Sequence, residues 1–142
     1  MKFSPRLILS SALCVLASCS SATSDEEKVR ALVAGAEKAA EARDVGDVLD
    51  FVADDYADTQ GNSRDSLKLF LHGYFAAHPK LELVTGIEEL AFPVDGLARA
   101  RVSVRGLDLA RFDAGESVTL DVELRRDGGE WRVVRADRAH ER

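Results

Sequence analysis

The hydrophobic pattern of the chain changes its period near Pro79, and this change limits the possible folds more than any other feature. Before Pro79, apolar residues recur at helical spacing in three segments. After Pro79, apolar and polar residues alternate, which is typical of strands that bury one face. A run of helices followed by a run of strands predicts an α+β domain.

The first two helices are expected directly before and after Asp44. The first begins at the capping-box pattern formed by Ser24 and Glu27 and extends to about Ala42. Asp44 is expected to cap a short second helix over residues 45–53, because its carboxylate can accept hydrogen bonds from the first turn.

A third helix is expected over residues 64–77. Asn62 or Ser63 is its expected N-cap, and Pro79 ends it because the residue before a proline avoids the helical conformation. Its apolar spacing predicts a buried stripe. The stripe consists of Leu67, Phe70, Leu71 and Tyr74.

The second half of the chain predicts an antiparallel meander of four strands. A change of parity predicts a bulge near residues 88–89, and turns are expected at residues 93–96 and 127–129. Residues 113–115 are expected to lie in a loop. The four expected strands are 80–92, 97–107, 117–126 and 130–137.

Two consecutive expected strands carry opposite charges on their outward faces. Arg99, Arg101 and Arg105 lie on one strand, and Asp121 and Glu123 lie on the next. Adjacent pairing of these strands would place the charges opposite one another and form a solvated lattice of ion pairs. The alternative is that this face joins two copies of the chain as a homodimer.

The N-terminus resembles the export signal of a bacterial lipoprotein. Residues 1–6 are basic, and residues 7–17 form an apolar run that is shorter than the ~20 residues of a membrane-spanning helix. The tetrapeptide Leu16-Ala17-Ser18-Cys19 resembles a lipobox. This resemblance implies that residues 1–18 are removed as a signal peptide and that a diacylglycerol is attached to the sulfur of Cys19.

Lipidation would make the bilayer the first expected partner of the protein, through Cys19. Two or three acyl chains, palmitate among them, anchor a protein stably, and residues 19–24 would form a short lipidated tether. The residue after the cysteine is Ser20, where Asp tends to retain similar lipoproteins in the inner membrane. We therefore expect a cell-envelope protein, on the outer membrane and facing the periplasm if the cell is Gram-negative.

The charge of the mature chain excludes one class of partner. Loss of Lys2 and Arg6 lowers the basic residues from 19 to 17 against 25 acidic ones, so the formal net charge falls from −6 to −8. A nucleic-acid partner needs a basic surface and is not expected.

Removal of Cys14 and lipidation of Cys19 leave no thiol for a disulfide.

The domain itself resembles the nuclear-transport-factor-2-like family. The resemblance is carried by Glu41-Ala42-Arg43-Asp44, by Phe51-Val52-Ala53-Asp54-Asp55-Tyr56, and by Gly129-Glu130-Trp131-Arg132-Val133-Val134. It covers about residues 25–138 and defines an expected domain over residues 25–139. It implies a cone-like α+β fold with three N-terminal helices on a curved four-stranded antiparallel sheet, the fold of ketosteroid isomerase.

Two adjacent residues are the catalytic candidates. Isomerase chemistry uses a carboxylate base and phenol or acid donors, roles that Asp55 and Tyr56 could fill. The alternative is a solvated acidic loop in which the ring of Tyr56 packs on the core. Tyr56, Tyr74 and Trp131 are the ligand-pocket candidates, with core packing as the alternative for Tyr74 and Trp131.

No cofactor and no metal site is expected. His72 and His78 lack the spacing of known zinc motifs, and the chain has no phosphate-binding or dinucleotide-binding glycine pattern. We therefore expect a membrane-anchored binding or scaffold module for a small apolar ligand or a protein. The alternatives are a small-molecule isomerase or lyase with an acid and a tyrosine in the cone, and a self-associating structural protein.

Replacement of Cys19 by alanine tests the anchor. In Cys19→Ala, we expect signal cleavage to stop and incorporation of labelled palmitate to be lost, because the sulfur that accepts the diacylglycerol is absent. Metabolic labelling and the mass of the purified chain measure both effects. Cleavage of the variant at the same bond would contradict the lipoprotein interpretation.

Overall fold

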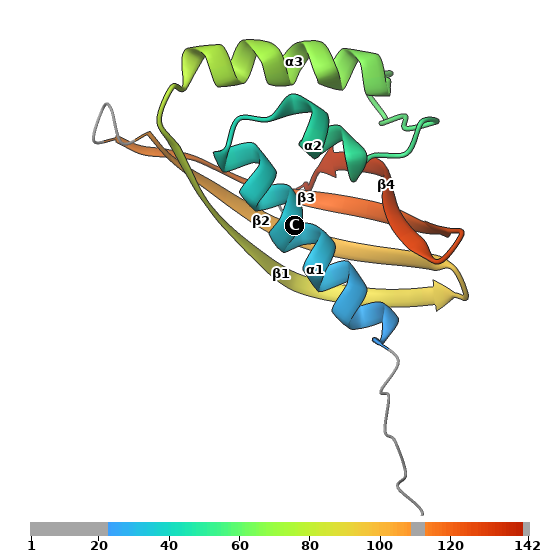
Figure 1. Cartoon of the computed structure of the whole chain (residues 1–142). Coiled ribbons are helices and arrows are strands. Elements are labelled where there is room, and N and C mark those ends of the chain that lie inside the picture. The colour runs from blue at the N-terminus through green and yellow to red at the C-terminus, as the bar shows by residue number, and fades with distance from the viewer. Residues whose placement is uncertain (1–22, 109–112, 141–142) are drawn as a thin grey trace, which may run out of the picture.

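The computed structural model describes residues 23–108 and 113–140, in which three helices precede a four-stranded sheet (Figure 1). The elements are α1 (Asp25–Glu41), α2 (Val45–Asp50), α3 (Arg64–Ala77), β1 (Leu81–Val94), β2 (Leu97–Asp108), β3 (Asp113–Asp127) and β4 (Glu130–Arg138). The strands form one antiparallel sheet in the order β1-β2-β3-β4. The expected α+β architecture, with three helices and a curved antiparallel sheet, is therefore confirmed.

Helix α1 lies across one face of the sheet and forms the main core with it (Figure 1). The core combines the apolar stripe of α1 with the inward face of β2, β3 and β4. Its buried members are Val29, Leu32, Ala98, Ala100, Val102, Val122, Leu124 and Trp131. The alternation that the sequence shows along β2 and β3 therefore sets which face of the sheet is buried.

Helix α3 packs on α2 and on the start of β1 instead of on the sheet face. Leu71 and Phe75 of α3 are buried with Leu49 of α2 and Leu81 of β1. The expectation that Phe70 belongs to the buried stripe is wrong, because its side chain is 62% exposed. The inward face of α3 is narrow, and a residue next to Leu71 is rotated by about 100° around the helix.

The N-caps expected from the sequence are confirmed. Ser24 and Glu27 form a complete capping box at α1. The Asp44 carboxylate accepts a hydrogen bond from the backbone of Asp47, and the Ser63 hydroxyl caps α3. These side chains satisfy backbone N–H groups that have no partner inside the helix.

Helix α2 is shorter than expected and ends at Asp50. The next residues pair with β4, because Val52 forms a parallel bridge with Val133 and the N–H of Ala53 donates to the Val133 carbonyl over 2.9 Å. The chain therefore leaves the helix three residues early to extend the sheet beyond its β4 edge.

Two details of the sheet test the strand expectations. The register of β1 against β2 breaks between Ile87 and Glu89, which confirms the expected bulge. The expected loop at residues 113–115 is wrong, because β3 begins at Asp113 and pairs with Asp108. Antiparallel pairing with β2 continues to this point, so the backbone stays in the ladder where the sequence alone indicates a break.

The outward face of the sheet carries the expected ion pairs. Arg101 lies opposite Asp121, and its Nε is 2.9 Å from the carboxylate. Arg99 lies opposite Glu123 at 3.5 Å, whereas Arg105 lies opposite Ser117. The lattice therefore forms between β2 and β3 within one copy of the chain.

Within the described residues, no helix is long and apolar enough to cross a membrane.

Leu124 provides a direct test of the core. Its side chain is 1% exposed, so Leu124→Ala should lower the free energy of unfolding by about 3 kcal/mol through lost burial and the cavity left behind. Urea denaturation monitored by circular dichroism measures the change. Leu69 is 74% exposed on α3, and Leu69→Ala should change stability by less than about 0.5 kcal/mol. Equal losses in both variants would contradict this core.

Candidate functional site

An apolar cavity of about 240 Å³ lies between the helices and the inward face of the sheet. Residues of α1, α2 and all four strands line it. Most of the lining side chains are aliphatic, among them Val33, Ala36, Ala40, Val48, Ala100, Val102, Leu120, Val133 and Ala136. A concave apolar space of this kind is the usual starting point for a ligand site.

Small side chains on both sides account for the cavity. The first half of α1 fills the space above the sheet with Val29 and Leu32, which are buried. The second half presents Ala36 and Ala40, and the strand beneath presents Ala100. Alanine extends only one carbon from the backbone, so the second half of the helix leaves space above a curved sheet.

Glu37 is the one acidic residue in the cavity lining. Its carboxylate accepts a hydrogen bond from the backbone N–H of Thr85 over 2.9 Å and another from the Thr85 hydroxyl. One turn later, Glu41 accepts from the N–H of Leu83 over 2.9 Å. β1 is an edge strand, so these two carboxylates satisfy backbone donors that no further strand would pair.

The sequence alone does not single out Glu37 as a site residue. The signal was available as two carboxylates four residues apart on α1, Glu37 and Glu41, which lie on the same side of the helix. Their partners are two residues apart on β1, Leu83 and Thr85. Nothing in the sequence pairs these two segments, so the match becomes visible only in the folded chain.

A groove of about 410 Å³ beneath α3 adjoins the cavity. Leu120 and Ala136 line both spaces, and Leu67 and Phe70 form the α3 side of the groove. Tyr56 lines the groove and donates its hydroxyl hydrogen to the Ala136 carbonyl at 3.3 Å. One of the expected ligand-pocket residues therefore lines a groove that adjoins the cavity.

The environment of Tyr56 keeps its phenol protonated. Burial raises the pKa of Tyr56 above its ordinary value of 10.0, and the negative charge of Asp58 raises this pKa further. Hydrogen bonds from Asn62 hold the pKa of Asp58 below its ordinary value of 3.8. Tyr56 is thus a hydrogen-bond donor at neutral pH and not a base.

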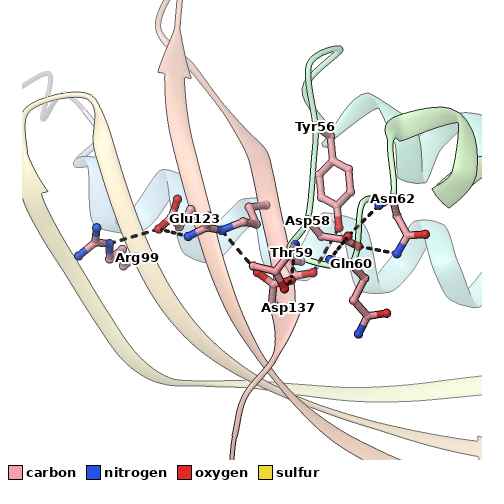
Figure 2. Close-up of polar contacts among 10 residues, drawn as sticks. Tyr56, Asp58, Thr59, Gln60, Asn62, Arg99, Glu123 and Asp137 are labelled. Atoms are coloured by element: carbon pink, nitrogen blue, oxygen red, sulfur yellow. Dashed lines mark hydrogen bonds and ion pairs between the residues drawn. The ribbon is translucent and has the colours of Figure 1, made fainter.

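Figure 2 shows how polar contacts hold the loop that follows Tyr56. Asp58 accepts hydrogen bonds from the backbone of Gln60 and from both the backbone and the side chain of Asn62, at 2.8 to 2.9 Å. Thr59 donates its backbone N–H and its hydroxyl to Asp137 of β4. The loop is therefore fastened to the end of β4, next to the groove.

Asp55 does not join Tyr56 in one site. Its carboxylate forms a two-point contact with Arg125, with both distances at 3.0 Å, and Arg125 also contacts Asp127. Asp55 lines a separate polar hollow with Arg64 and Arg125. The Arg125 hydrogen bonds hold the pKa of Asp55 below 3.8, so the carboxylate is ionised and a poor proton acceptor.

The two other ligand-pocket candidates lie outside the cavity. Tyr74 stacks between Phe70, at a ring-centroid distance of 5.7 Å, and His78, at 4.2 Å. Trp131 is buried, and its indole N–H donates to Asp25 at 3.1 Å. Trp131 lines a groove between α1 and β4 that is distinct from the cavity.

In residues 23–108 and 113–140, no group of three His, Cys, Asp or Glu side chains could hold a metal ion. His72 is exposed on α3, and His78 Nδ1 lies 2.8 Å from the Tyr74 carbonyl. Cys19 and the expected signal peptide, residues 1–18, lie outside the described residues.

Solved structures share this arrangement over most of the chain. A protein of unknown function from Shewanella oneidensis MR-1, described as NTF-2 like, superposes with a TM-score of 0.64 and 14% identity, covering 81% of this chain and 98% of the other. The 142-residue chain therefore has the nuclear-transport-factor-2-like fold. A domain of unknown function with a cystatin-like fold from Nostoc punctiforme PCC 73102 gives a TM-score of 0.69 at 14% identity, covering 84% and 79%.

A third structural neighbour carries an enzyme name. It is a candidate scytalone dehydratase from Novosphingobium aromaticivorans DSM 12444, with a TM-score of 0.63 and 14% identity, covering 82% of this chain and 89% of the other. The sequence matches no family model and no curated protein. These likenesses establish the fold, and a fold of this kind hosts many activities.

The titration of Asp55 tests whether this carboxylate is available as a base. We expect its carbon-13 signal to titrate below 3.8, because Arg125 stabilises the ionised form. The folded pKa lies below the unfolded one, so the ion pair stabilises the fold above pH ~4 and this contribution disappears as the pH falls through the folded pKa. In Arg125→Gln, the titration midpoint of the Asp55 carboxyl should rise toward its ordinary pKa. A midpoint above 3.8 in the wild type would restore Asp55 as a candidate base.

Proposed function

We propose that this protein is a lipid-anchored envelope lipoprotein whose NTF2-like domain binds a small apolar molecule in the cavity beneath α1. The aliphatic lining of that cavity carries the proposal. Burial of apolar surface drives binding of this kind, and a few polar groups at the wall set the orientation of the ligand.

The size and chemistry of the cavity define the ligand. A cavity of ~150 Å³ accommodates a benzene molecule, so 240 Å³ corresponds to about ten non-hydrogen atoms. Thr85 and Glu37 are the polar residues of the lining, and they hydrogen-bond to each other. The ligand is therefore a compact hydrocarbon or aromatic molecule with at most one hydroxyl or similar donor.

The anchor rests on the sequence of the N-terminus. Removal of residues 1–18 and lipidation of Cys19 would attach the chain to the bilayer, and Ser20 at the next position favours the outer membrane of a Gram-negative cell. α1 begins at Asp25, so the binding domain would follow its anchor closely. Such a module would hold its ligand at the membrane surface.

A second candidate function is an isomerase or lyase reaction in the same cavity. The position of Glu37 favours this function. Its carboxylate lies on the cavity wall, whereas the carboxylate of Asp55 lies in a separate hollow. The reaction also needs a proton donor, and the hydroxyl of Tyr56 is bonded to Ala136 in the adjoining groove. We therefore expect binding without turnover. Turnover of a cyclic ketone that is lost in Glu37→Gln would establish the enzyme instead. Self-association through the outer sheet face stays a prediction.

Filling the cavity tests the binding proposal. Ala36 lines the cavity and Ala34 is exposed on the same helix, so Ala36→Leu and Ala34→Leu form a matched pair. With indole and 2-naphthol as probes, we expect Ala36→Leu to weaken binding at least tenfold, because the leucine occupies the space of the ligand. Ala34→Leu should bind as the wild type does. Chemical-shift titration of backbone amides measures the affinity and locates the probe.

Three results would contradict the proposal. One is an absence of shifts in the wild type with either probe. Another is equal affinity in both leucine variants. The third is a set of shifts confined to the outer face of the sheet, away from Val102 and Leu120.

A further inference from the structure

Three large apolar side chains are exposed at the end of the β1–β2 hairpin. Phe92 is 40% exposed, Val94 is 57% exposed and Leu97 is 41% exposed. They flank a two-residue turn, Asp95 and Gly96. We refer to residues 92–97 as the hairpin tip. Apolar side chains gathered at the end of a hairpin leave hydrophobic surface in water.

The hairpin tip is fixed to the start of α1. Arg126 donates to Asp95 over 2.7 Å and to Asp25, the first residue of α1, over 2.6 Å. The backbone N–H of Arg126 also donates to the Gly96 carbonyl over 2.9 Å. One side chain thus joins the turn of the hairpin to the residue at which α1 begins.

Aromatic contacts reinforce this junction. The ring of Trp131 meets Phe92 edge-on at a centroid distance of 5.8 Å, and the Arg126 guanidinium lies 5.7 Å from the Trp131 ring. The indole N–H of Trp131 donates to the same Asp25 carboxylate. The hairpin tip therefore keeps a fixed position relative to the point where the tether enters the domain.

The length of the tether sets how far this junction can lie from the bilayer. Five residues lie between Cys19 and Asp25, so the chain between them has six residue-to-residue steps, and at no more than about 3.6 Å each these span at most about 22 Å. The headgroup region on one side of a bilayer is ~5–8 Å thick. A lipid on Cys19 would therefore hold the hairpin tip within reach of the membrane surface.

We propose that the hairpin tip docks on the bilayer that holds the acyl chains of Cys19, with Phe92, Val94 and Leu97 in the interfacial layer. This inference rests on the lipid anchor of the proposed function. The tip has the composition of interfacial segments, in which aromatic and aliphatic side chains enter the boundary between headgroups and acyl chains.

The charges around the tip are compatible with this contact. Asp95 and Asp25 share Arg126, so neither carboxylate faces the lipid as an unpaired charge. A stable protein interface buries about 800 Å² on each partner, far more than three side chains provide. A domain that is already tethered needs only a weak additional contact, because the tether raises the effective concentration of the surface.

Docking would also orient the domain. Figure 1 shows α3 across the side of the molecule remote from the start of α1. Leu69 of α3 is 74% exposed and serves as an apolar reference position far from the tip. With the hairpin tip on the membrane, α3 and the groove beneath it would face the aqueous phase.

Site-specific fluorescence on the full-length, acylated protein tests the proposal. Val94→Cys and Leu97→Cys place a label on the tip, and Leu69→Cys places one on α3. With Cys14 removed and Cys19 acylated, the introduced cysteine is the single free thiol. Each variant is labelled with a nitrobenzoxadiazole dye and reconstituted into phosphatidylethanolamine and phosphatidylglycerol vesicles, with or without doxyl-labelled phospholipid as a quencher. The acyl mass and flotation with the vesicles are measured first.

We expect flotation of all three proteins, with quenching at both tip positions at least threefold stronger than at position 69. Flotation with equal quenching at the three positions would overturn docking and leave the anchor intact. Absence of the acyl mass or of flotation would overturn both the anchor and the docking. Emission at the tip that changes with protein density but not with the quencher would assign the tip to contact between copies, and would also overturn docking.

Discussion

The packing of α1 across the curved sheet is the constraint on which the rest of the structure depends. At its start, Asp25 is bonded to Arg126 and Trp131. Toward its end, Glu37 and Glu41 are bonded to the exposed edge of β1. The helix is thus held at both ends, while the alanines of its second half are too small to fill the space beneath it. The cavity follows from a helix that is fixed in position but incompletely packed.

This arrangement connects the two parts of the proposed function. The start of α1 is bonded to the hairpin tip through Arg126, and the second half of α1 forms a wall of the cavity. A ligand in the cavity would contact the same helix that a membrane anchor would hold. Arg126 lies at the junction because it bonds to both the hairpin turn and the first residue of α1.

Residue patterns predicted the elements well because capping and alternation are local. Ser24, Asp44 and Ser63 cap the helices as expected, and the bulge in β1 appears where the parity changes. The exposure of Phe70 could not be predicted in the same way, because its burial depends on which element covers α3, and this is a tertiary property.

The candidate site was harder to predict than the fold. Asp55 and Tyr56 are adjacent in sequence, but their side chains contact different partners, Arg125 and Ala136. Asp55 lies in a turn that the Tyr56 N–H closes by donating to the Ala53 carbonyl over 3.1 Å, and the sequence does not show which element each side chain meets. The cavity was invisible because it results from alanines on separate elements that the fold brings together. Glu37 was overlooked for the same reason, since its partner on β1 lies 48 positions away in the sequence.

A crystal structure of the protein under xenon pressure would test whether the cavity exists. Dry apolar cavities bind xenon, whereas filled cores and polar spaces do not. We expect a xenon atom between Ala36 of α1 and the inward side chains Val102 and Leu120, with α1 in the same position. A close-packed interior without xenon, or ordered water in that space, would contradict it.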